Sequence, residues 1–325
     1  MESRRDFLKK AAVAAAGLTI VPSKTIAGLG HKAPSDTMNI VGIGIGGKGH
    51  PNLVGMKTEN IIGLCDIDWK YAKNCFEEFP DAKRYWDWRK MFDELGDQID
   101  GVMVATPDHT HATIAATALT MGKHVYCQKP LTHSVYESRL LTKLAAKYKV
   151  ATQMGNQGHN IEGTMQTVEW IQGGVIGDVR EVHLWTNRPM WRQGYFDRPA
   201  GVDIPSNLNY DVWLGPAPDK PYNPEMLHFA WRGLWDYGTG AMGDMGAHTF
   251  DAPIWALNLG MPTKIQATST PYNKDYLPQS ECVTYEFPAR GNMPPVKVTW
   301  SDGGIKPARP AELGTNRQLR DCLLY

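Results

Sequence analysis

The sequence has no excess of charge of either sign, because 34 Lys and Arg residues are balanced by 34 Asp and Glu residues. A chain without a positive field has nothing to draw nucleic acid or an anionic membrane toward it over a distance. Hydrophobic residues make up 42% of the chain and charged residues 21%, which is ordinary for a globular protein. We therefore expect a small-molecule ligand and no nucleic-acid partner.

Cysteine is scarce, and long apolar runs are missing. The five cysteines, at positions 65, 75, 127, 282 and 322, include no C-x-x-C pair, which argues against a disulfide framework and a cysteine zinc site. Cys65 and Cys127 lie in apolar strand-like runs and are interpreted as small buried hydrophobic residues. No apolar run after the N-terminus is long enough to span a bilayer, so we expect no membrane span in the mature protein.

The N-terminus has the pattern of an export signal. Ser3-Arg-Arg-Asp-Phe-Leu-Lys9 precedes an apolar run at residues 11–21, which is too short for a stable transmembrane helix. Twin arginines ahead of such a run resemble the twin-arginine (Tat) signal, with Thr25-Ile-Ala27 as a weak cleavage site. We expect residues 1–34 to be signal and linker, and the protein to work in the periplasm or otherwise outside the cytoplasm.

A glycine-rich turn follows the first strand. The apolar run at residues 38–43 leads into Gly44-x-Gly46-x-x-Gly49, and a helix is expected from about Pro51. Glycines between a strand and a helix let the backbone approach a pyrophosphate at the helix N-terminus. An overlapping register that begins at Gly42 would place the turn inside the strand and is not preferred.

An acidic residue ends the next strand, at residues 61–65. Asp66 lies about 20 residues beyond the glycines, where a carboxylate bonds ribose hydroxyls and repels a 2′-phosphate. This spacing predicts NAD as the cofactor and disfavours NADP. The alternative interpretation is an exposed acidic loop, since Asp68 follows closely.

Strand and helix continue to alternate through the strand at residues 101–105. The loop at Thr106-Pro107 is expected under the nicotinamide side of the cofactor, with His111 opening the next helix. His109 and His111 stand two residues apart, but no third ligand has a defined spacing, so we expect no metal site.

A strand-like run from His124 ends at Gln128-Lys129-Pro130. Proline cannot extend a strand and forces the preceding residue into an extended conformation, so Lys129 is presented at the strand's carboxyl end. Ligands of open α/β sheets bind at that end, although an isolated Lys-Pro is more often a solvated lysine before a turn. A strand at residues 150–154, leading to Asn156, completes a doubly wound parallel sheet in a domain of residues 35–157.

The remainder, residues 158–325, predicts an α/β domain with an open, mainly antiparallel sheet. Strands are expected at residues 179–185, 264–270, 282–287 and 296–300. The connection after the first of them is rich in tryptophan, proline and glycine. Trp191, Arg192, Trp231 and Arg232 are candidates for contacts with a sugar, although such tryptophans are also common anchors of loops.

Asp244 and His248 stand four residues apart behind a run of glycines, on one face of an expected helix. A histidine beside a carboxylate can hold a proton near neutral pH, as removal of a proton from an alcohol requires. An isolated Asp-x-x-x-His is more often a surface pair. Its occurrence together with the glycine turn and Lys129 favours a catalytic group.

These features together resemble the Gfo/Idh/MocA oxidoreductase family over residues 38–310. Members of that family carry Glu-Lys-Pro at the end of a Rossmann domain and D-x-G-x-H in the second domain. Gln128-Lys129-Pro130 and Asp244-Met-Gly-Ala-His248 match these segments, with Gln128 in place of the acidic residue. Gln128 and Asn156 join the residues expected to bind the cofactor.

The resemblance implies an NAD-dependent oxidoreductase that acts on a secondary alcohol of a sugar or glycoside. His248 would be the general base, Lys129 would polarise the alcohol oxygen, and Asp244 would orient His248 or bond the substrate. Two alternatives stay open: a glycoside-cleaving enzyme that recycles NAD, and an inactive sugar-binding relative.

Export and the chain's end add further expectations. An exported enzyme has no reliable pool of free NAD, so the nucleotide should be loaded before export and held tightly, covered by the N-terminal segment or the tryptophan-rich loops. We also expect a homo-oligomer. Residues 314–325 have the pattern of neither a strand nor a helix, which suggests a truncated C-terminus in a group whose members are usually longer.

Overall fold

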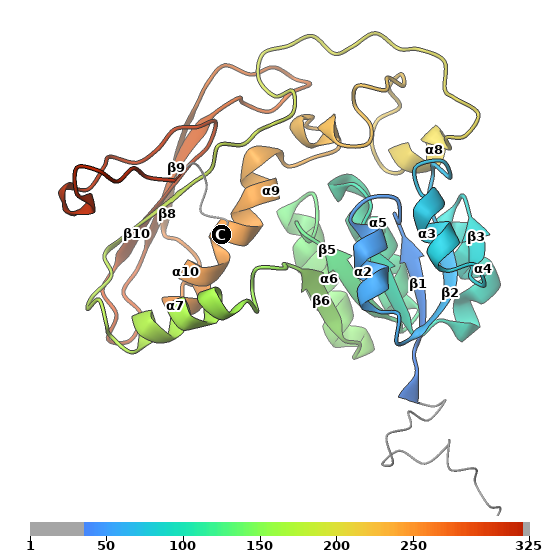
Figure 1. Ribbon diagram of the computed structural model, residues 1–325, viewed down its shortest axis with the longest axis horizontal. Coiled ribbons are helices and arrows are strands. Elements are labelled where there is room, and N and C mark those ends of the chain that lie inside the picture. The colour runs from blue at the N-terminus through green and yellow to red at the C-terminus, as the bar shows by residue number, and fades with distance from the viewer. Residues whose placement is uncertain (1–35, 321–325) are drawn as a thin grey trace, which may run out of the picture.

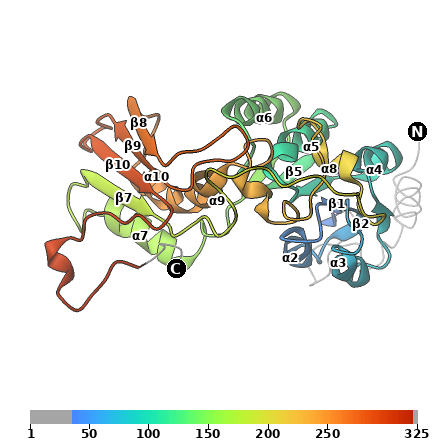
Figure 2. The same cartoon turned by 90° about the horizontal axis from the view of Figure 1, so that it is seen from above.

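Residues 36–320 are described by the computed structural model, and they form two α/β units that face each other across helix α9 (Figures 1 and 2). The first contains a six-stranded sheet in the order β3-β2-β1-β4-β5-β6, with every pair parallel. Its strands are β1 (Asn39–Ile43), β2 (Asn60–Cys65), β3 (Lys83–Tyr85), β4 (Gly101–Val104), β5 (His124–Gln128) and β6 (Thr152–Gly155). The predicted doubly wound parallel sheet is confirmed.

Helices cover both faces of this sheet. They are α2 (Gly49–Gly55), α3 (Lys73–Glu78), α4 (Trp88–Leu95), α5 (Asp108–Thr120) and α6 (Val135–Tyr148). One apolar cluster joins α4, α5 and α6 to one face, and a second joins α2 and α3 to the other. Burial on both faces explains why the strands are nearly continuous apolar runs. Cys65 and Cys127 are 2% and 1% exposed, as expected for small hydrophobic residues in these clusters.

The order of the strands reverses between β1 and β4. The chain winds outward from β1 to β3 on one side and from β4 to β6 on the other. At such a point the loops at the carboxyl ends of the central strands diverge and leave a crevice, which is where open α/β sheets bind ligands. The loops that follow β1, β2, β4 and β5 therefore face a common space.

The second unit contains a four-stranded sheet in the order β7-β10-β9-β8. Its strands are β7 (Glu181–Trp185), β8 (Lys264–Ser269), β9 (Glu281–Phe287) and β10 (Val296–Ser301). Two of the pairings are antiparallel, and β7 lies parallel to β10. The open, mainly antiparallel sheet is confirmed.

Three helices pack against one face of the second sheet. They are α7 (Glu162–Gln172), α9 (Gly240–Thr249) and α10 (Asp251–Ala256). Val168, Met245 and Ala256 join Val298 and Trp300 in a buried cluster between helices and sheet. Helix α9 thereby rests on the second sheet while its other side turns toward the first unit (Figure 1). None of the helices within residues 36–320 is both long and apolar enough to cross a bilayer.

Residues 186–239, here called the bridging segment, connect β7 to α9 by way of the first unit. The segment arches from the second sheet to α8 (Tyr210–Leu214), where the Trp213 oxygen lies 2.8 Å from His109 Nε2 of α5, and returns through the short helix η4 (Ala230–Gly233) (Figure 1). It has a core of its own, in which Trp213, Trp231 and Tyr237 are buried. Many of its aromatic residues are therefore anchors of loops, which was the alternative to contacts with a sugar.

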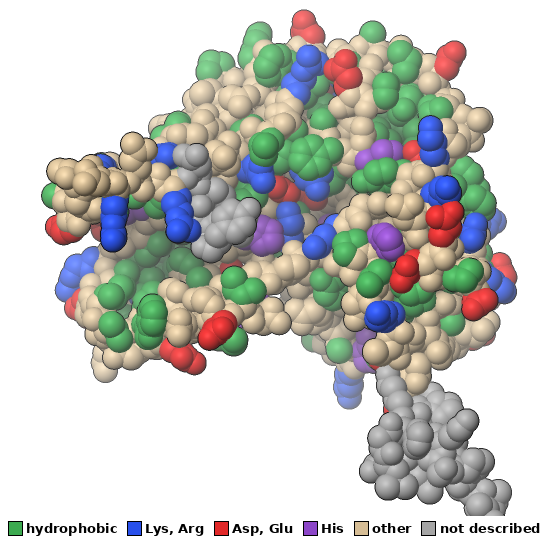
Figure 3. Space-filling view, viewed as in Figure 1, with side chains coloured by type: hydrophobic (Ala, Val, Ile, Leu, Met, Phe, Trp, Pro, Cys, Tyr) green, Lys and Arg blue, Asp and Glu red, His purple; other side chains and the backbone are tan. Residues whose placement is uncertain are grey.

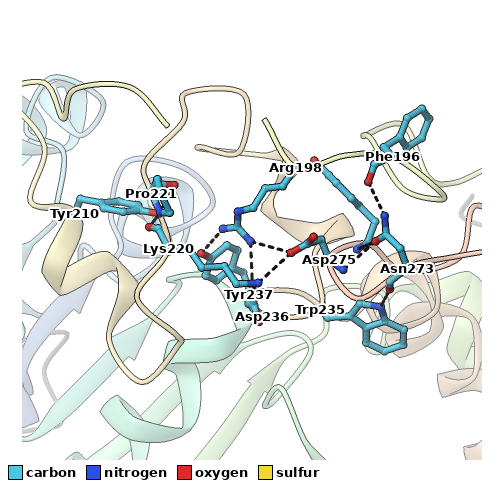
Figure 4. A network of polar contacts seen from close by, with 11 residues as sticks. Phe196, Arg198, Tyr210, Lys220, Pro221, Trp235, Asp236, Tyr237, Asn273 and Asp275 are labelled. Atoms are coloured by element: carbon cyan, nitrogen blue, oxygen red, sulfur yellow. Dashed lines mark hydrogen bonds and ion pairs between the residues drawn. The ribbon is translucent and has the colours of Figure 1, made fainter. Parts of the chain in front are cut away.

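A charged network fixes the base of the bridging segment (Figure 4). Lys220 Nζ lies 2.6 Å from Asp236 Oδ2 and 3.0 Å from Asp275 Oδ1. Arg198 is paired with Asp236 at 3.3 Å, and its Nη2 donates to Tyr237 Oη at 2.6 Å. Two cations and two carboxylates neutralise one another in a place with little solvent, so the network joins distant parts of the segment into one rigid piece.

Two glycines of helix α2 provide a test of how tightly the glycine turn is packed. A Cβ at Gly49 would lie 2.2 Å from the backbone oxygen of Gly44, whereas a Cβ at Gly55 would meet nothing within 4 Å. Gly49→Ala should lower the free energy of unfolding by about 1–3 kcal/mol, because a backbone atom must move. Gly55→Ala should leave stability unchanged or raise it by up to about 1 kcal/mol. Urea denaturation of both variants measures the difference, and equal midpoints would contradict the close approach.

Candidate active site

A cavity of about 430 Å³ lies at the carboxyl ends of the first sheet's central strands. Gly44, Asp66 and Lys129 line it from the first unit, and Arg232 and Asp244 line it from the second. In Figure 3, basic and acidic side chains gather near the centre of the face where the two units meet. The cavity therefore belongs to neither unit alone.

The glycine turn has the register expected from the sequence. Gly44 has φ +78°, and a Cβ there would lie 2.7 Å from the backbone of Ala105 and Thr106. Gly49 packs against the Gly44 oxygen, which brings α2 close to β1. Backbone without side chains therefore forms the cavity wall in front of a helix N-terminus, and this geometry fits the pyrophosphate of a dinucleotide.

Asp66 directly follows β2 at the edge of the same cavity and is only 7% exposed. Its Oδ2 accepts a hydrogen bond of 2.8 Å from Gly46 N, and its Oδ1 accepts one of 3.0 Å from Asp68 N. Burial raises the pKa of Asp66 above its usual range, although these hydrogen bonds oppose the shift. The carboxylate is tied to the glycine turn, at the position where a ribose hydroxyl binds in this fold.

The bridging segment closes one side of the cavity. The rings of Tyr71 and His228 stack with centroids 4.0 Å apart and planes 3° apart. His228 Nε2 lies 3.0 Å from Asp68 Oδ2, and Asn207 Nδ2 donates to Asp68 Oδ1 at 2.9 Å. Trp213 of α8 completes the cover, so the loop after β2 is held beneath residues that are distant in sequence.

Lys129 directly follows β5, and its side chain crosses to the second unit. Its Nζ donates to Asp244 Oδ1 at 2.7 Å and to the Asp244 backbone oxygen at 3.0 Å. Arg232 Nε donates to the same Oδ1 at 3.2 Å. Burial acts to raise the pKa of Asp244, but the charges and hydrogen bonds of Lys129 and Arg232 outweigh it and hold that pKa below its usual range.

His248 lies one turn further along α9, on the face that carries Asp244. Its Nδ1 is 2.8 Å from Asn156 Oδ1, while Asn156 Nδ2 donates to the Ala247 oxygen at 3.0 Å. Since that amide oxygen can only accept, the proton of a neutral imidazole belongs on Nδ1 and the acceptor is Nε2. Burial, followed by the charge of Lys129, lowers the pKa of His248.

Asn156, which the sequence assigned to the cofactor, is thus the hydrogen-bond partner that orients His248. Orientation of His248 was one of the two roles expected for Asp244. In the structure the Asp244 carboxylate is bonded to Lys129 and Arg232 instead. Gln128 and the loop at Thr106 and Pro107 do line the cavity, as expected for residues that bind the cofactor.

His111 does not line the cavity, contrary to the expectation that it contacts the cofactor. The residue is 1% exposed, with Nδ1 2.8 Å from the Pro130 oxygen and Nε2 2.8 Å from the Thr106 oxygen. Helix α5 begins at Asp108, so His111 lies within its first turn and does not open it. Its place is behind the cavity, where it joins the loop after β4 to the loop after β5.

The four candidates for sugar contacts divide into two pairs. Trp231 and Arg232 line the cavity. Trp191 is 7% exposed and donates to Gln193 Oε1 at 2.9 Å, and Arg192 is paired with Glu225 at 3.3 Å. Neither residue of this second pair is part of the cavity lining, because the loop after β7 turns away toward the charged network before the chain returns.

Asp108 is a cavity residue that the sequence analysis missed. It is 4% exposed, and its Oδ2 accepts a hydrogen bond of 2.7 Å from Thr239 Oγ1. Burial raises the pKa of Asp108 to about 7. An acidic residue at the start of a helix, directly after the Thr106-Pro107 loop, was the available signal. Tyr71 and His228 carried no such signal, because their stacking depends on the path of the bridging segment.

A two-unit fold of this kind, with a glycine turn on one unit and an Asp and His helix on the other, defines a class of dinucleotide-binding proteins with a separate substrate-binding domain. Two family models match the chain: the NAD-binding Rossmann fold of the Gfo/Idh/MocA oxidoreductase family at residues 37–156, and its C-terminal alpha/beta domain at residues 185–291. The chain belongs to the Gfo/Idh/MocA oxidoreductase family.

Curated relatives include dehydrogenases named for a sugar phosphate and for inositol. Glucose-6-phosphate 3-dehydrogenase of Bacillus subtilis is 29% identical over 223 residues, which cover 68% of this chain and 53% of that protein. Inositol 2-dehydrogenase of Salmonella typhimurium is 26% identical over 148 residues, or 44% of each chain. The chain thus spans about half the length of these relatives.

Solved structures share the fold at low sequence identity. GenD2 from gentamicin A biosynthesis, crystallised with NAD, has a TM-score of 0.59 at 19% identity and covers 82% of this chain and 66% of its own. The WlbA dehydrogenase of Bordetella pertussis, crystallised with NADH and UDP-GlcNAcA, has a TM-score of 0.58 at 15% identity, with 81% and 71% covered.

The charges around His248 predict opposite shifts of its pKa in two variants. Lys129→Met removes a positive neighbour and should raise the pKa of His248, whereas Asp251→Asn removes a negative neighbour and should lower it further. NMR titration of the labelled imidazole in each variant measures the shifts. Shifts of the same sign in both variants would show that His248 does not sense these charges.

Proposed function

We propose that the protein is an NAD-dependent oxidoreductase that oxidises a secondary alcohol of a sugar or glycoside. The observation that carries this proposal is the ion pair between Lys129 and Asp244, which forms at 2.7 Å between the two units, beside the glycine turn. It brings a cation and a carboxylate to one end of a dinucleotide cavity, with His248 one turn further along α9. Bound nicotinamide would supply the hydride acceptor.

The protein's own residues divide the handling of the alcohol between them. Lys129 Nζ is a cationic donor held in place by Asp244, so it can stabilise negative charge that develops on the alcohol oxygen. His248 is neutral near pH 7 because its pKa is lowered, and Nε2 is free to take the hydroxyl proton. Asn156 keeps the imidazole in the required tautomer.

Polar groups at the cavity support a polyhydroxylated substrate. Arg232 lies over the rings of Phe229 and Trp231, at 4.6 and 4.4 Å, with its guanidinium directed to Asp244. Aromatic faces beside hydrogen-bonding groups suit a sugar ring, which has both apolar faces and hydroxyl edges. Glucose-6-phosphate and inositol, for which the two curated relatives are named, point in the same direction because both carry several hydroxyl groups.

The preference for NAD over NADP is part of the proposal. Asp66 and Asp68 both lie in the loop after β2, and both carboxylates are mostly buried. A 2′-phosphate would bring a further negative charge to this loop, with a cost that grows as water is excluded. The nearby imidazole of His228 is already engaged, with Nε2 3.0 Å from Asp68 Oδ2.

Alanine substitutions at Lys129 and His248 test the assignment. Each should lower kcat by about 10²- to 10⁴-fold, since a positioned acid or base contributes that much, while the nucleotide stays bound. Turnover is followed as nicotinamide absorbance on a panel of mono- and disaccharides, with product mass. His183→Ala, at an exposed histidine of β7, is the matched control and should not alter the rate.

The same panel separates the alternatives. Near-normal rates in both variants would refute the assignment. Release of an aglycone from an aryl glycoside without net NADH would favour cleavage by NAD recycling, and sugar binding without any absorbance change would favour an inactive relative.

Export by the Tat pathway and a periplasmic location are also part of the proposal, with the twin-arginine sequence as their support. The signal lies outside the described residues.

We also propose a homo-oligomer, since all six residues of edge strand β8 are exposed and could be covered by a second copy. Within the family, we propose that the protein belongs with the secreted members that process sugars.

Tight retention of the cofactor follows from export. Affinities near the micromolar level, about −8 kcal/mol, are too weak to hold a nucleotide for days. The bridging segment supports stronger retention, because Trp213, His228 and Phe229 cover the cavity that the glycine turn opens. Turnover would then need one substrate to reduce the bound cofactor and another to reoxidise it.

Protein purified without added nucleotide should release nearly stoichiometric NAD(H) when it is denatured. His228→Ala removes the stacking on Tyr71 and the contact with Asp68, so this variant should lose nucleotide during purification. His183→Ala should retain it. A wild-type protein that is empty and needs millimolar NAD for activity would contradict retention.

A further inference from the structure

Helix α9 carries Asp244 and His248, but it begins without a cap of its own. Its N-cap residue, Thr239, makes no side-chain hydrogen bond to the first turn. Gly240 follows with φ +67°. Something outside the helix must therefore fix the point at which α9 starts, and the start of a helix sets the position of every residue along it.

Three residues of the first unit hold the turn that precedes α9. Asp108 Oδ2 accepts the 2.7 Å hydrogen bond from Thr239 Oγ1, and His133 Nε2 lies 3.1 Å from the Gly238 oxygen. His109 N donates to the Tyr237 oxygen at 3.3 Å. Consecutive residues of the turn are thus each bonded to the first unit, by the loops that also carry Thr106 and Lys129.

The same turn is packed from behind against other parts of the bridging segment. A Cβ at Gly238 would lie 2.5 Å from the Cα and the oxygen of Arg232. Tyr237 Oη accepts from Arg198 within the charged network (Figure 4). The turn is therefore the place where the first unit, the bridging segment and α9 meet, and a shift there would move Arg232 and Asp244 together.

We propose that Asp108 is a positioning residue for the proposed reaction: by holding Thr239, it sets the start of α9 and so places Asp244 against Lys129 and His248 beside the substrate alcohol. The catalytic consequence of this role rests on the proposed function. The hydrogen bond between Asp108 and Thr239, here called the clamp, does not depend on that function. A misplacement of about 1 Å can cost about 100-fold in rate, and Thr239 lies five residues before Asp244 and nine before His248.

The hydrogen bond, and not the charge, is what the clamp requires. Asp108 faces Arg232, Asp244 and Lys129, and burial raises the pKa of Asp108 to about 7. A carboxyl whose pKa is raised on folding adds stability that is present at low pH and is lost as pH rises toward 7. Asp108→Asn keeps an acceptor for Thr239 but has no carboxyl to ionise, so it does not lose stability as pH rises. At pH 8 this variant should be at least as thermostable as the wild type.

The experiment compares variants that break the hydrogen bond with variants that keep it. Asp108→Ala and Thr239→Val remove it, whereas Asp108→Asn and Thr239→Ser retain it. Hydrogen exchange of the peptides that cover residues 237–249 is measured in the full-length purified protein. We expect at least tenfold faster exchange in Asp108→Ala and in Thr239→Val. The double variant should exchange no faster than either single variant, because each single substitution already removes the shared hydrogen bond. The conservative variants should exchange like the wild type.

Turnover gives a second measurement. Asp108→Ala and Thr239→Val should lower kcat by 10- to 100-fold, with little change in KM or in bound nucleotide, and the conservative variants should stay within threefold of the wild type. Thr142→Ala is the control, since it removes an exposed hydroxyl that donates to the Ser138 oxygen within helix α6. It should change neither exchange at α9 nor kcat.

The outcomes separate this proposal from the proposed function. Wild-type exchange in Asp108→Ala, additive effects in the double variant, or equal damage from Asp108→Asn and Asp108→Ala would each overturn the positioning role. If exchange responds as expected but no sugar reduces bound nucleotide in the wild type, the clamp stands and the proposed reaction falls.

Discussion

The ion pair between Lys129 and Asp244 is the interaction on which the site depends. Its side chains are 16% and 14% exposed, so both charges have lost most of their water. Removal of one partner from such a pair leaves a buried charge, at a cost of about 3–5 kcal/mol. Each unit of the protein therefore supplies a charge that the other must neutralise, and the cavity between them is fixed by the same contact.

Charge around Lys129 is balanced without an acidic residue at position 128. Gln128 is 4% exposed, and its side chain bonds Tyr126 Oη at 3.3 Å and the Lys129 amide at 3.4 Å. A glutamate there would add a charge to a site that already contains Asp244 and Asp108. The neutral amide leaves Asp244 as the partner of both Lys129 and Arg232, which ties the lysine more closely to the second unit.

The bridging segment serves both ends of the cavity. Its outward half brings Asn207 and Trp213 to the loop after β2, and its return brings His228 and Arg232 along the cavity to the start of α9. The charged network keeps these two halves in register (Figure 4). Cover over the cavity and placement of α9 are therefore consequences of one connection, although they concern opposite ends of the site.

The sequence by itself determined the features that depend on a few neighbouring residues. Apolar runs bounded by glycine and proline marked the strands, the glycine spacing marked the turn at Gly44, and the chain direction placed Lys129 at the end of β5. Only the tertiary structure decided which side chains meet: His248 with Asn156 across 92 positions, Thr239 with Asp108 across 131, and His228 with Asp68 across 160. Local sequence signals reflect backbone conformation and burial within one helix or strand. These long-range contacts depend instead on how the bridging segment returns to the first sheet. No short stretch of sequence encodes that path.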